Sequence, residues 1–238
     1  FEAGMHATGS SNSFFGYQAG KGGTTSAPFS SGANNIAVGK SAFVAFTTGH
    51  SNIAIGYEAM SAATTGHSNV AMGYQAADAM TTGQQNVAIG HSALGKDTIG
   101  HTSVAVGYSA GSQQVFGSAG ATNNTLVGSG AGFWNVTGTG NTYIGANVGT
   151  GASGNSNNNN TAVGVSALLA ITTGGQNVVM GQSAGRNITT GTSNVIIGRV
   201  AAYASTDVDK TVIIGEQAAY TGNMTSAADG TVSIGNGA

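Results

Sequence analysis

The sequence predicts an all-β chain that folds as one parallel β-solenoid, or β-roll, of about 13 coils over residues 1–238. Three observations lead to this class: a phrase repeats with a base period of 17 residues, β-branched residues alternate within it, and a turn signal lies between copies. A unit of this length is too short for a helix pair or a propeller blade, and it suits one coil with a short strand and tight corners. Stacked coils lie about 4.8 Å apart, so equivalent residues superpose.

A glycine marks each copy of the phrase, as in NIAVGKSAF from Asn35 and NVAIGHSAL from Asn86. The marker glycines are Gly16, Gly39, Gly56, Gly73, Gly90, Gly107, Gly128, Gly145, Gly164, Gly181, Gly198, Gly215 and Gly235. Residues 1–11 form a lead-in to the first coil. Longer gaps follow four of the markers and predict loop insertions near 21–30, 115–123, 150–158 and 221–228, where binding specificity is expected.

The residues just before each marker predict the strand of the coil. An apolar residue lies directly before every marker, and Ile, Val or Thr lies three residues before it in every copy except at Ser13. This alternation predicts that both columns face the core and that the residue between them faces outward. The middle residue is alanine in early copies and Val179, Ile196 or Ile213 in late ones. Because a strand that is apolar on both faces is normally covered on both, these three are predicted to contact another chain.

Asparagine lies four residues before the marker in most copies, and it predicts a ladder in which side-chain amides hydrogen-bond from coil to coil. The predicted ladder residues are Asn35, Asn52, Asn69, Asn86, Asn177 and Asn194. Thr-Thr-Gly precedes the asparagine at 47–49, 64–66, 81–83, 172–174 and 189–191, and is typical of a turn. Alanine lies three residues after nearly every marker, which indicates a closely packed corner.

The composition excludes several classes of function. Charged residues make up 6% of the chain and the formal net charge is −2, which offers no footprint for nucleic acid or an anionic membrane. An apolar content of 40% argues against disorder, and no apolar run is long enough for a membrane span. Cysteine is absent, so disulfides and thiolate metal sites are excluded. Since the first residue is Phe1, the sequence is expected to be a processed or trimmed piece.

The titratable residues do not predict an active site, and neither enzymatic activity nor a metal or cofactor is expected. The eight carboxylates place no two in the same column of adjacent coils, whereas glycoside hydrolysis needs a converging pair. Asp207 and Asp209 could bind a cation only with further oxygen ligands, so a solvated loop is the favoured interpretation. His50, His67 and His101 follow the turn glycine, but Gln84 interrupts them, which favours a solvated polar column over a metal site.

Aromatic residues are the candidate ligand contacts. Tyr57, Tyr74 and Tyr108 follow their markers and predict a stripe along one edge, while Phe133 and Trp134 lie beside the 115–123 insertion. Amphipathic rings suit sugars and protein receptors, although the Phe133–Trp134 pair could equally cover a bulge in the coil.

Units such as NIAIGYEAM and NVAMGYQAA, followed by TTG, resemble the head repeats of trimeric autotransporter adhesins and related repeats of phage tail fibres. The resemblance covers about Ser11 to Ala238, and it implies a left-handed β-roll with three chains side by side. The 17-residue period is longer than the usual head repeat, and no heptad stalk or membrane anchor is present in these residues. Trimerisation is therefore implied by the resemblance.

These features predict a non-enzymatic extracellular fibre or adhesin module on a cell or virion surface. It would be a homo-oligomer, either a trimer or a stacked filament, and would contact a glycan or a surface receptor through its loops. One alternative is a surface filament built by end-to-end stacking, because exposed solenoid ends are unpaired strand edges. Another is an ice-binding solenoid that presents arrays of the paired threonines.

Overall fold

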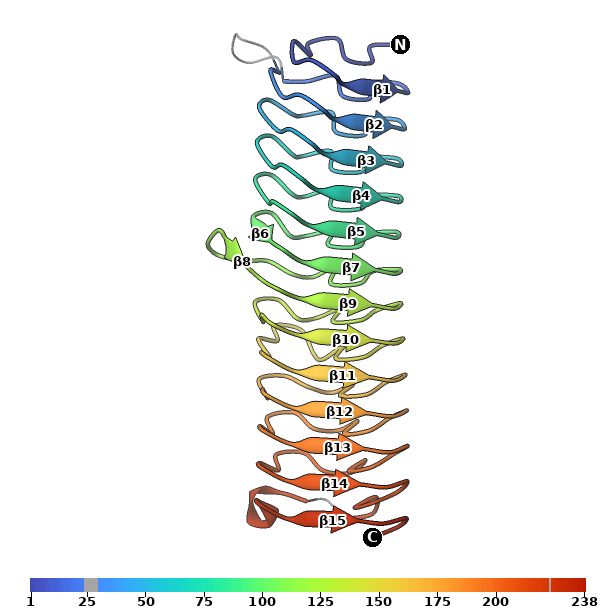
Figure 1. The fold of residues 1–238 in the computed structure, drawn as a ribbon, viewed down its shortest axis with the longest axis vertical. Coiled ribbons are helices and arrows are strands. Elements are labelled where there is room, and N and C mark those ends of the chain that lie inside the picture. The colour runs from blue at the N-terminus through green and yellow to red at the C-terminus, as the bar shows by residue number, and fades with distance from the viewer. Residues whose placement is uncertain (24–29, 223) are drawn as a thin grey trace. The chain divides into compact units, whose positions relative to one another are not determined.

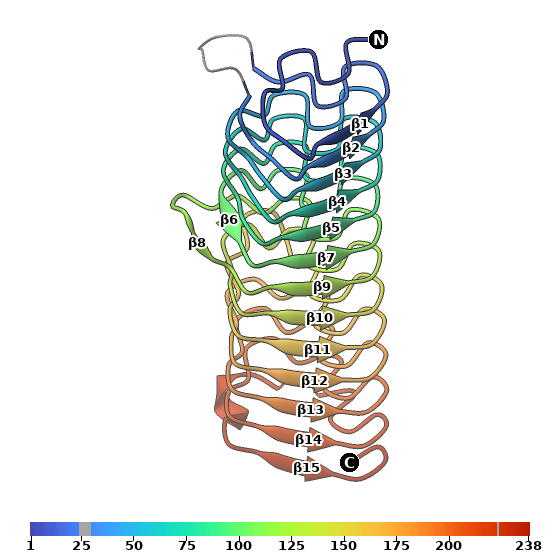
Figure 2. The same ribbon diagram turned by 45° about the horizontal axis from the view of Figure 1, so that its top comes forward.

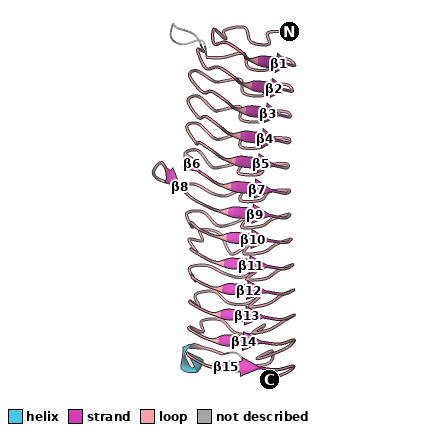
Figure 3. Ribbon diagram, in the orientation of Figure 1, coloured by secondary structure: helices cyan, strands magenta, loops and turns pink. Residues whose placement is uncertain are grey.

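The computed structural model describes residues 1–23, 30–222 and 224–238, and it confirms the parallel β-solenoid. Each coil contributes one three-residue strand that ends directly before a marker glycine (Figure 1). Figure 3 shows that the strand occupies a short part of each coil and that loops and turns form the rest. The chain divides into two compact units, Phe1–Thr122 and Asn123–Ala238.

In the first unit, six strands pair in parallel and in chain order, with equivalent residues opposite each other, as in Ile53 with Val70. They are β1 (Ser13–Phe15), β2 (Ile36–Val38), β3 (Ile53–Ile55), β4 (Val70–Met72), β5 (Val87–Ile89) and β7 (Val104–Val106). The 115–123 insertion contributes β8 (Gly120–Ala121), which pairs with β6 (Gly100–His101). The 21–30 insertion lies largely outside the described residues.

In the second unit, the strands again pair in parallel and in chain order (Figure 2). They are β9 (Thr125–Val127), β10 (Thr142–Ile144), β11 (Thr161–Val163), β12 (Val178–Met180), β13 (Val195–Ile197), β14 (Val212–Ile214) and β15 (Val232–Ile234). The insertion near 221–228 contains the 3₁₀ helix η1 (Ser226–Ala228), while its residue 223 is outside the described part.

The strands face the opposite way to the prediction. The middle residue of each strand points into the coil, and the two flanking residues point outward. Val179, Ile196 and Ile213 are 0% exposed, so the prediction that they contact another chain is wrong. They are core residues, because in a strand of period two only one face can line the narrow coil interior.

Two positions fill the coil interior in complementary fashion: the middle strand residue and the residue four after the marker. In most coils whose strand supplies alanine, as at Ala88, the second position is large, as at Leu94. The exceptions are the coils of Ala71 and Ala105, whose second positions are alanine and glycine. Where the strand supplies Leu126 or Tyr143, the second position is glycine. A Cβ on Gly132 would lie 2.9 Å from the Leu126 side chain, and one on Gly149 would overlap the Tyr143 ring. In these coils, apart from the two exceptions, the two positions therefore share the space of one large side chain.

The coil turns through backbone conformations that L-residues seldom adopt. The marker glycines have φ between +127° and +139°, a region that strongly favours glycine. A Cβ on Gly39 would lie 2.6 Å from the carbonyl oxygen of Gly56 in the next coil. Ordinary side chains also take left-handed φ values at other corners, such as Ser51 at +58° and Leu94 at +50°. The stacked coils hold these corners in place.

The asparagine column forms a hydrogen-bonded ladder inside each unit. Asn52 is representative: its backbone N–H and Nδ2 donate to Asn35 Oδ1 at 3.0 and 3.2 Å, and Nδ2 also donates to the carbonyl of Gly66 at 2.9 Å. The same pattern runs from Asn160 to Asn177 and Asn194 in the second unit. Ser103 and Thr211 occupy the ladder position in later coils, where their N–H groups still donate to the preceding asparagine.

Candidate functional site

The outward residues of β2, β3, β4, β5 and β7 form an apolar surface on the first unit, which we call the outer face of that unit. Its members are Ile36, Val38, Ile53, Ile55, Val70, Met72, Val87, Ile89, Val104 and Val106. Ile36 is 41% exposed and Met72 is 38% exposed. None of these positions carries a charge or a hydrogen-bonding side chain, so the face offers apolar contact alone.

The second unit has an outer face of mixed character. Its first column begins with Thr125, Thr142 and Thr161 and continues with Val178, Val195 and Val212. Its second column remains apolar, and Met180 is 45% exposed. In both units the sheet is therefore apolar on its inner side and largely apolar on its outer side, an arrangement that is normally covered on both.

In the first unit, the residues directly after four marker glycines carry rings that form a stack. Each of these residues comes two positions after the last outward residue of its strand. The ring centroids of Tyr57 and Tyr74 are 5.1 Å apart, those of Tyr74 and His91 are 4.9 Å apart, and those of His91 and Tyr108 are 5.2 Å apart. Lys40 Nζ lies 5.5 Å from the Tyr57 ring centroid. The Glu58 carboxylate raises the pKa of the Tyr57 hydroxyl, because the two groups hydrogen-bond and ionised Tyr57 would meet a like charge.

This geometry changes how the tyrosines could bind a ligand. Sugar rings stack on aromatic faces, but both faces of the Tyr74 ring lie against neighbouring rings, those of Tyr57 and His91. Tyr108 ends the stack, contacts a ring at His91 and is 61% exposed. The sequence missed His91 as a member of the stack, although its position one residue after Gly90 is the signal that would have placed it there. We therefore interpret the stack chiefly as a stabilising element of the first unit.

Phe133 and Trp134 lie in the second unit, where their rings meet edge to face with centroids 4.9 Å apart. Both side chains are half-buried, and the Trp134 backbone N–H donates to the Thr150 carbonyl of the next coil. The arrangement is that of a surface pair packed against its own coil. Their role as ligand contacts stays a prediction.

The histidines and aspartates do not form a metal site in the part of the chain that the structure describes, where no three such groups come together. His50 and His67 stack on each other with centroids 4.7 Å apart, while His101 Nδ1 accepts the Gln84 N–H at 3.0 Å. The expectation that no two carboxylates share a column is wrong. Asp209 and Asp229 occupy equivalent positions in adjacent coils, and the Asp209 N–H donates to Asp229 Oδ1 at 2.8 Å.

The paired threonines do not form a flat double array. The first threonine of each pair donates its hydroxyl to the carbonyl of the equivalent residue in the next coil, as in Thr64 to Thr81 at 3.2 Å. The second threonine, such as Thr65, is exposed, and Ile99 interrupts that column. One of the two threonine columns is therefore committed to holding the coils together, and the ice-binding alternative stays a prediction.

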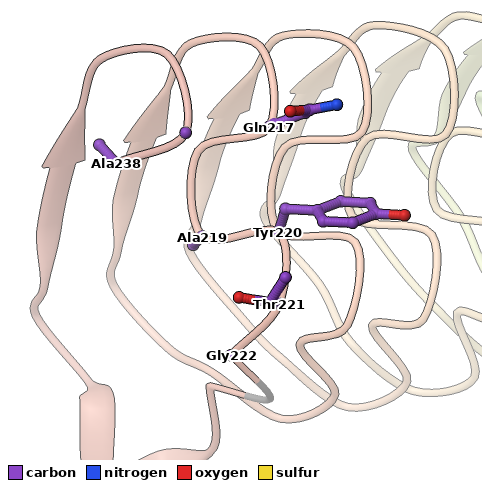
Figure 4. A pocket seen from close by; sticks show the side chains of 7 residues that line it. Gln217, Ala219, Tyr220, Thr221, Gly222 and Ala238 are labelled. Atoms are coloured by element: carbon purple, nitrogen blue, oxygen red, sulfur yellow. The ribbon is translucent and has the colours of Figure 1, made fainter.

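The last coil of the second unit carries a pocket of about 380 Å³ (Figure 4). Its lining residues are Gln217, Ala219, Tyr220, Thr221, Gly222, Gly237 and Ala238. Figure 4 shows that the Gln217 and Thr221 side chains point in different directions. The equivalent position beside earlier coils of the unit is covered by the following coil, so the pocket belongs to the surface on which coils stack and we assign it no ligand.

A search of protein-family models, curated proteins and solved structures finds no match to this chain. Within residues 1–23, 30–222 and 224–238, no helix has the length and hydropathy that a membrane crossing requires. The class that the fold defines is a parallel β-solenoid whose outer face is apolar over β2 to β7 of the first unit and of mixed character in the second unit.

Proposed function

We propose that this protein is a rigid structural module of an extracellular fibre, that its copies associate laterally through their outer faces, and that the fibre adheres to a glycan-bearing surface. The observation that carries the proposal is the exposure of Ile36, Met72 and Met180 on sheet faces that continue from coil to coil. A second copy is a suitable occupant, because it presents the same rows of side chains at the same spacing of about 4.8 Å.

The coil construction supports a passive, load-bearing role. Backbone hydrogen bonds, the asparagine ladder and the threonine hydroxyls all link one coil to the next. The outer faces would be protected from water in a lateral assembly, which removes the cost of exposing contiguous apolar surface. The resemblance to adhesin heads implies three copies. Sedimentation velocity, which tests association, also measures the number of copies in the oligomer.

Sedimentation velocity of the full chain at tens of micromolar tests the proposal. We expect one discrete oligomer, and we expect Met72→Lys to shift it toward monomer, because the substitution places a charge at the centre of the outer face. Thr65→Lys is the matched control: it adds the same charge at an exposed turn of the same coil and should leave the oligomer intact.

A wild-type monomer at this concentration would overturn the proposed association. A series of sizes that grows with concentration, unaffected by Met72→Lys, would favour end-to-end stacking in its place. Circular dichroism of each variant checks that the solenoid is retained, which separates a broken interface from a broken fold.

A further inference from the structure

A polar column of the second unit lies six residues before the marker glycines, at Thr139, Asn158, Gly175, Thr192 and Asp209. The N–H and hydroxyl of Thr139 both donate to Asn158 Oδ1, at 2.7 and 3.3 Å. The N–H and hydroxyl of Thr192 likewise both donate to Asp209 Oδ1, at 2.5 and 2.9 Å. At this column, therefore, a side-chain oxygen of the next coil receives the donors of the coil before it.

Gly175 interrupts the pattern because it has no side chain. Residue 175 has no side-chain oxygen that could accept the Asn158 N–H. The next side chain of the column, opposite the Gly175 N–H, is Thr192, whose hydroxyl donates to Asp209. Among the described residues, the N–H groups of Asn158 and Gly175 donate to no acceptor. Two backbone donors in adjacent coils thus lie along the column without a protein partner.

A pocket of about 350 Å³ lies at this interruption. Its lining residues are Asn158, Asn159, Thr173, Gly175, Gln176 and Thr192. The Thr173 hydroxyl and the Asn159 amide form no hydrogen bond with the described part of the chain, and Gln176 uses only Oε1, which accepts from Ser193 Oγ at 3.2 Å. The pocket is uncharged, rich in free donors, and at the lower end of the size range of small-molecule sites.

The acceptors that fill the column elsewhere indicate the chemistry that fits. They are the amide oxygen of Asn158 and the carboxylate oxygens of Asp209 and, in the last coil, Asp229. Asp209 and Asp229 already place two negative charges in the column beyond Thr192, so a further carboxylate in the pocket would be repelled and a neutral amide would not. An acetamido group has such an oxygen for the Asn158 N–H, at the position that a side chain of residue 175 would otherwise fill, and sugar hydroxyls can pair with Thr173, Asn159 and Gln176.

The geometry points to a binding site for a neutral N-acetylated sugar, which enters with its acetamido oxygen toward the N–H group of Asn158, where residue 175 has no side chain. This inference rests on the adhesive part of the proposed function and names the glycan class involved. It does not depend on lateral association, so sedimentation results and sugar-binding results can fail separately.

Ligand-observed saturation-transfer NMR on the full chain, with N-acetylglucosamine as the probe, tests the site. We expect millimolar binding, with the strongest saturation at the acetyl methyl group. Glucose should bind at least about tenfold more weakly, because it lacks the amide acceptor for the Asn158 N–H. Glucuronic acid should also bind more weakly, because its carboxylate meets Asp209.

Two variants and one matched control complete the experiment. Gly175→Asn gives the column its own amide oxygen and should abolish binding. A Cβ at this position would lie 2.8 Å from the Asn158 carbonyl oxygen, so a second variant that leaves the backbone alone is needed. Thr173→Val removes only a hydroxyl and should weaken binding several-fold, about the loss of one hydrogen bond. Thr190→Val makes the same change in the next coil, outside the pocket, and should have no effect.

Equal binding of glucose and N-acetylglucosamine would overturn the inference. So would tighter binding of glucuronic acid, which would mark a carboxylate site, or the same response from Thr173→Val and Thr190→Val. Absence of binding at tens of millimolar would also overturn it, while a discrete oligomer in sedimentation would leave the structural role standing.

Discussion

Asp97 is a buried carboxyl group whose hydrogen bonds are incomplete. Its Oδ1 accepts the Gly100 N–H at 2.8 Å, while its Oδ2 has no partner among the described residues. Burial raises the pKa of this carboxyl, because the charged form is removed from water. Asn135 occupies the equivalent position in the second unit, where Oδ1 accepts the Gly138 N–H at 3.0 Å and Nδ2 donates to the Gly138 carbonyl at 3.1 Å.

Asp97→Asn is expected to stabilise the protein at neutral pH by about 1–3 kcal/mol, the range for an unsatisfied buried polar group. The folded-state pKa lies above the unfolded value of about 3.9, so folding favours the protonated form. Wild-type stability should therefore fall as the pH rises from about 4 through the folded-state pKa. Asp97→Asn should lack this pH dependence, because residue 97 no longer titrates. Denaturant unfolding at pH 3 and pH 7 measures the difference in unfolding free energy between Asp97→Asn and wild type. The same difference at both pH values would contradict a raised pKa for Asp97.

The marker glycines are constrained both by φ and by the next coil. Gly73 has a φ of +137°, and a Cβ there would lie 2.6 Å from the Gly90 carbonyl oxygen. Gly73→Ala should cost about 3 kcal/mol or more, since it combines backbone strain with a contact that cannot relax locally. Gly117→Ala is the control, because no atom lies within 4 Å of its added Cβ, and its stability should stay within about 0.5 kcal/mol of wild type. Thermal unfolding of the pair checks this prediction.

At the scale of the single coil, the repeat works because three kinds of column have separate tasks. Glycine and left-handed corners turn the chain, asparagine joins the strand of one coil to the turn of the next, and paired interior positions share one volume in most coils. The interior pairing explains why the middle strand residue varies in size from coil to coil without any change in the backbone path.

A double-mutant cycle at Ala88 and Leu94 tests this shared volume. Ala88→Leu alone should destabilise by about 1–3 kcal/mol, because the coil already contains Leu94. Ala88→Leu with Leu94→Gly reproduces the Leu126–Gly132 arrangement of the second unit, and it should recover at least half of the loss. The Leu94→Gly substitution would also remove the left-handed strain at this position, where φ is +50°. Additive effects of the two substitutions would show that the positions do not share space.

At the scale of the whole molecule, charge contributes little to stability. The ion pairs within the described residues are Lys21–Glu2, at 2.9 Å, and Arg199–Glu216, and the side chains of both pairs are at least partly exposed. Exposed pairs of this kind contribute little to stability, because water and salt screen the attraction between the charges. The fold therefore depends on apolar packing in the coil interior and on uncharged hydrogen bonds between coils.

The unfolding temperature should accordingly change by no more than a few degrees between about 0.05 and 0.5 M NaCl, where screening removes most surface attraction. Scanning calorimetry of the full chain measures this directly. A marked loss of stability with salt would show that charges outside the two pairs matter.

The sequence by itself determined the class of fold, the 17-residue period and the asparagine column, because every coil repeats the same local requirements at the same offsets. It also placed Tyr57, Tyr74 and Tyr108 in one column. The tertiary structure alone decided which strand face points inward, since Ile-Ala-Ile and Val-Ile-Ile are apolar on both faces and period-two alternation has no preferred side. The size relation between Ala88 and Leu94, and between Leu126 and Gly132, was the overlooked signal.

The pocket at Gly175 and the adjacency of Asp209 and Asp229 likewise depended on the stacked coils. Their residues are polar and ordinary in sequence, and their significance comes from the neighbour about 4.8 Å away along the stack. In the sequence alone, a glycine after a turn is interpreted as a flexible position. In a column of oxygen acceptors, Gly175 lacks the acceptor that the N–H of the preceding coil would meet. A linear sequence states which residues occur in each coil, whereas only the register between coils determines which donors meet acceptors.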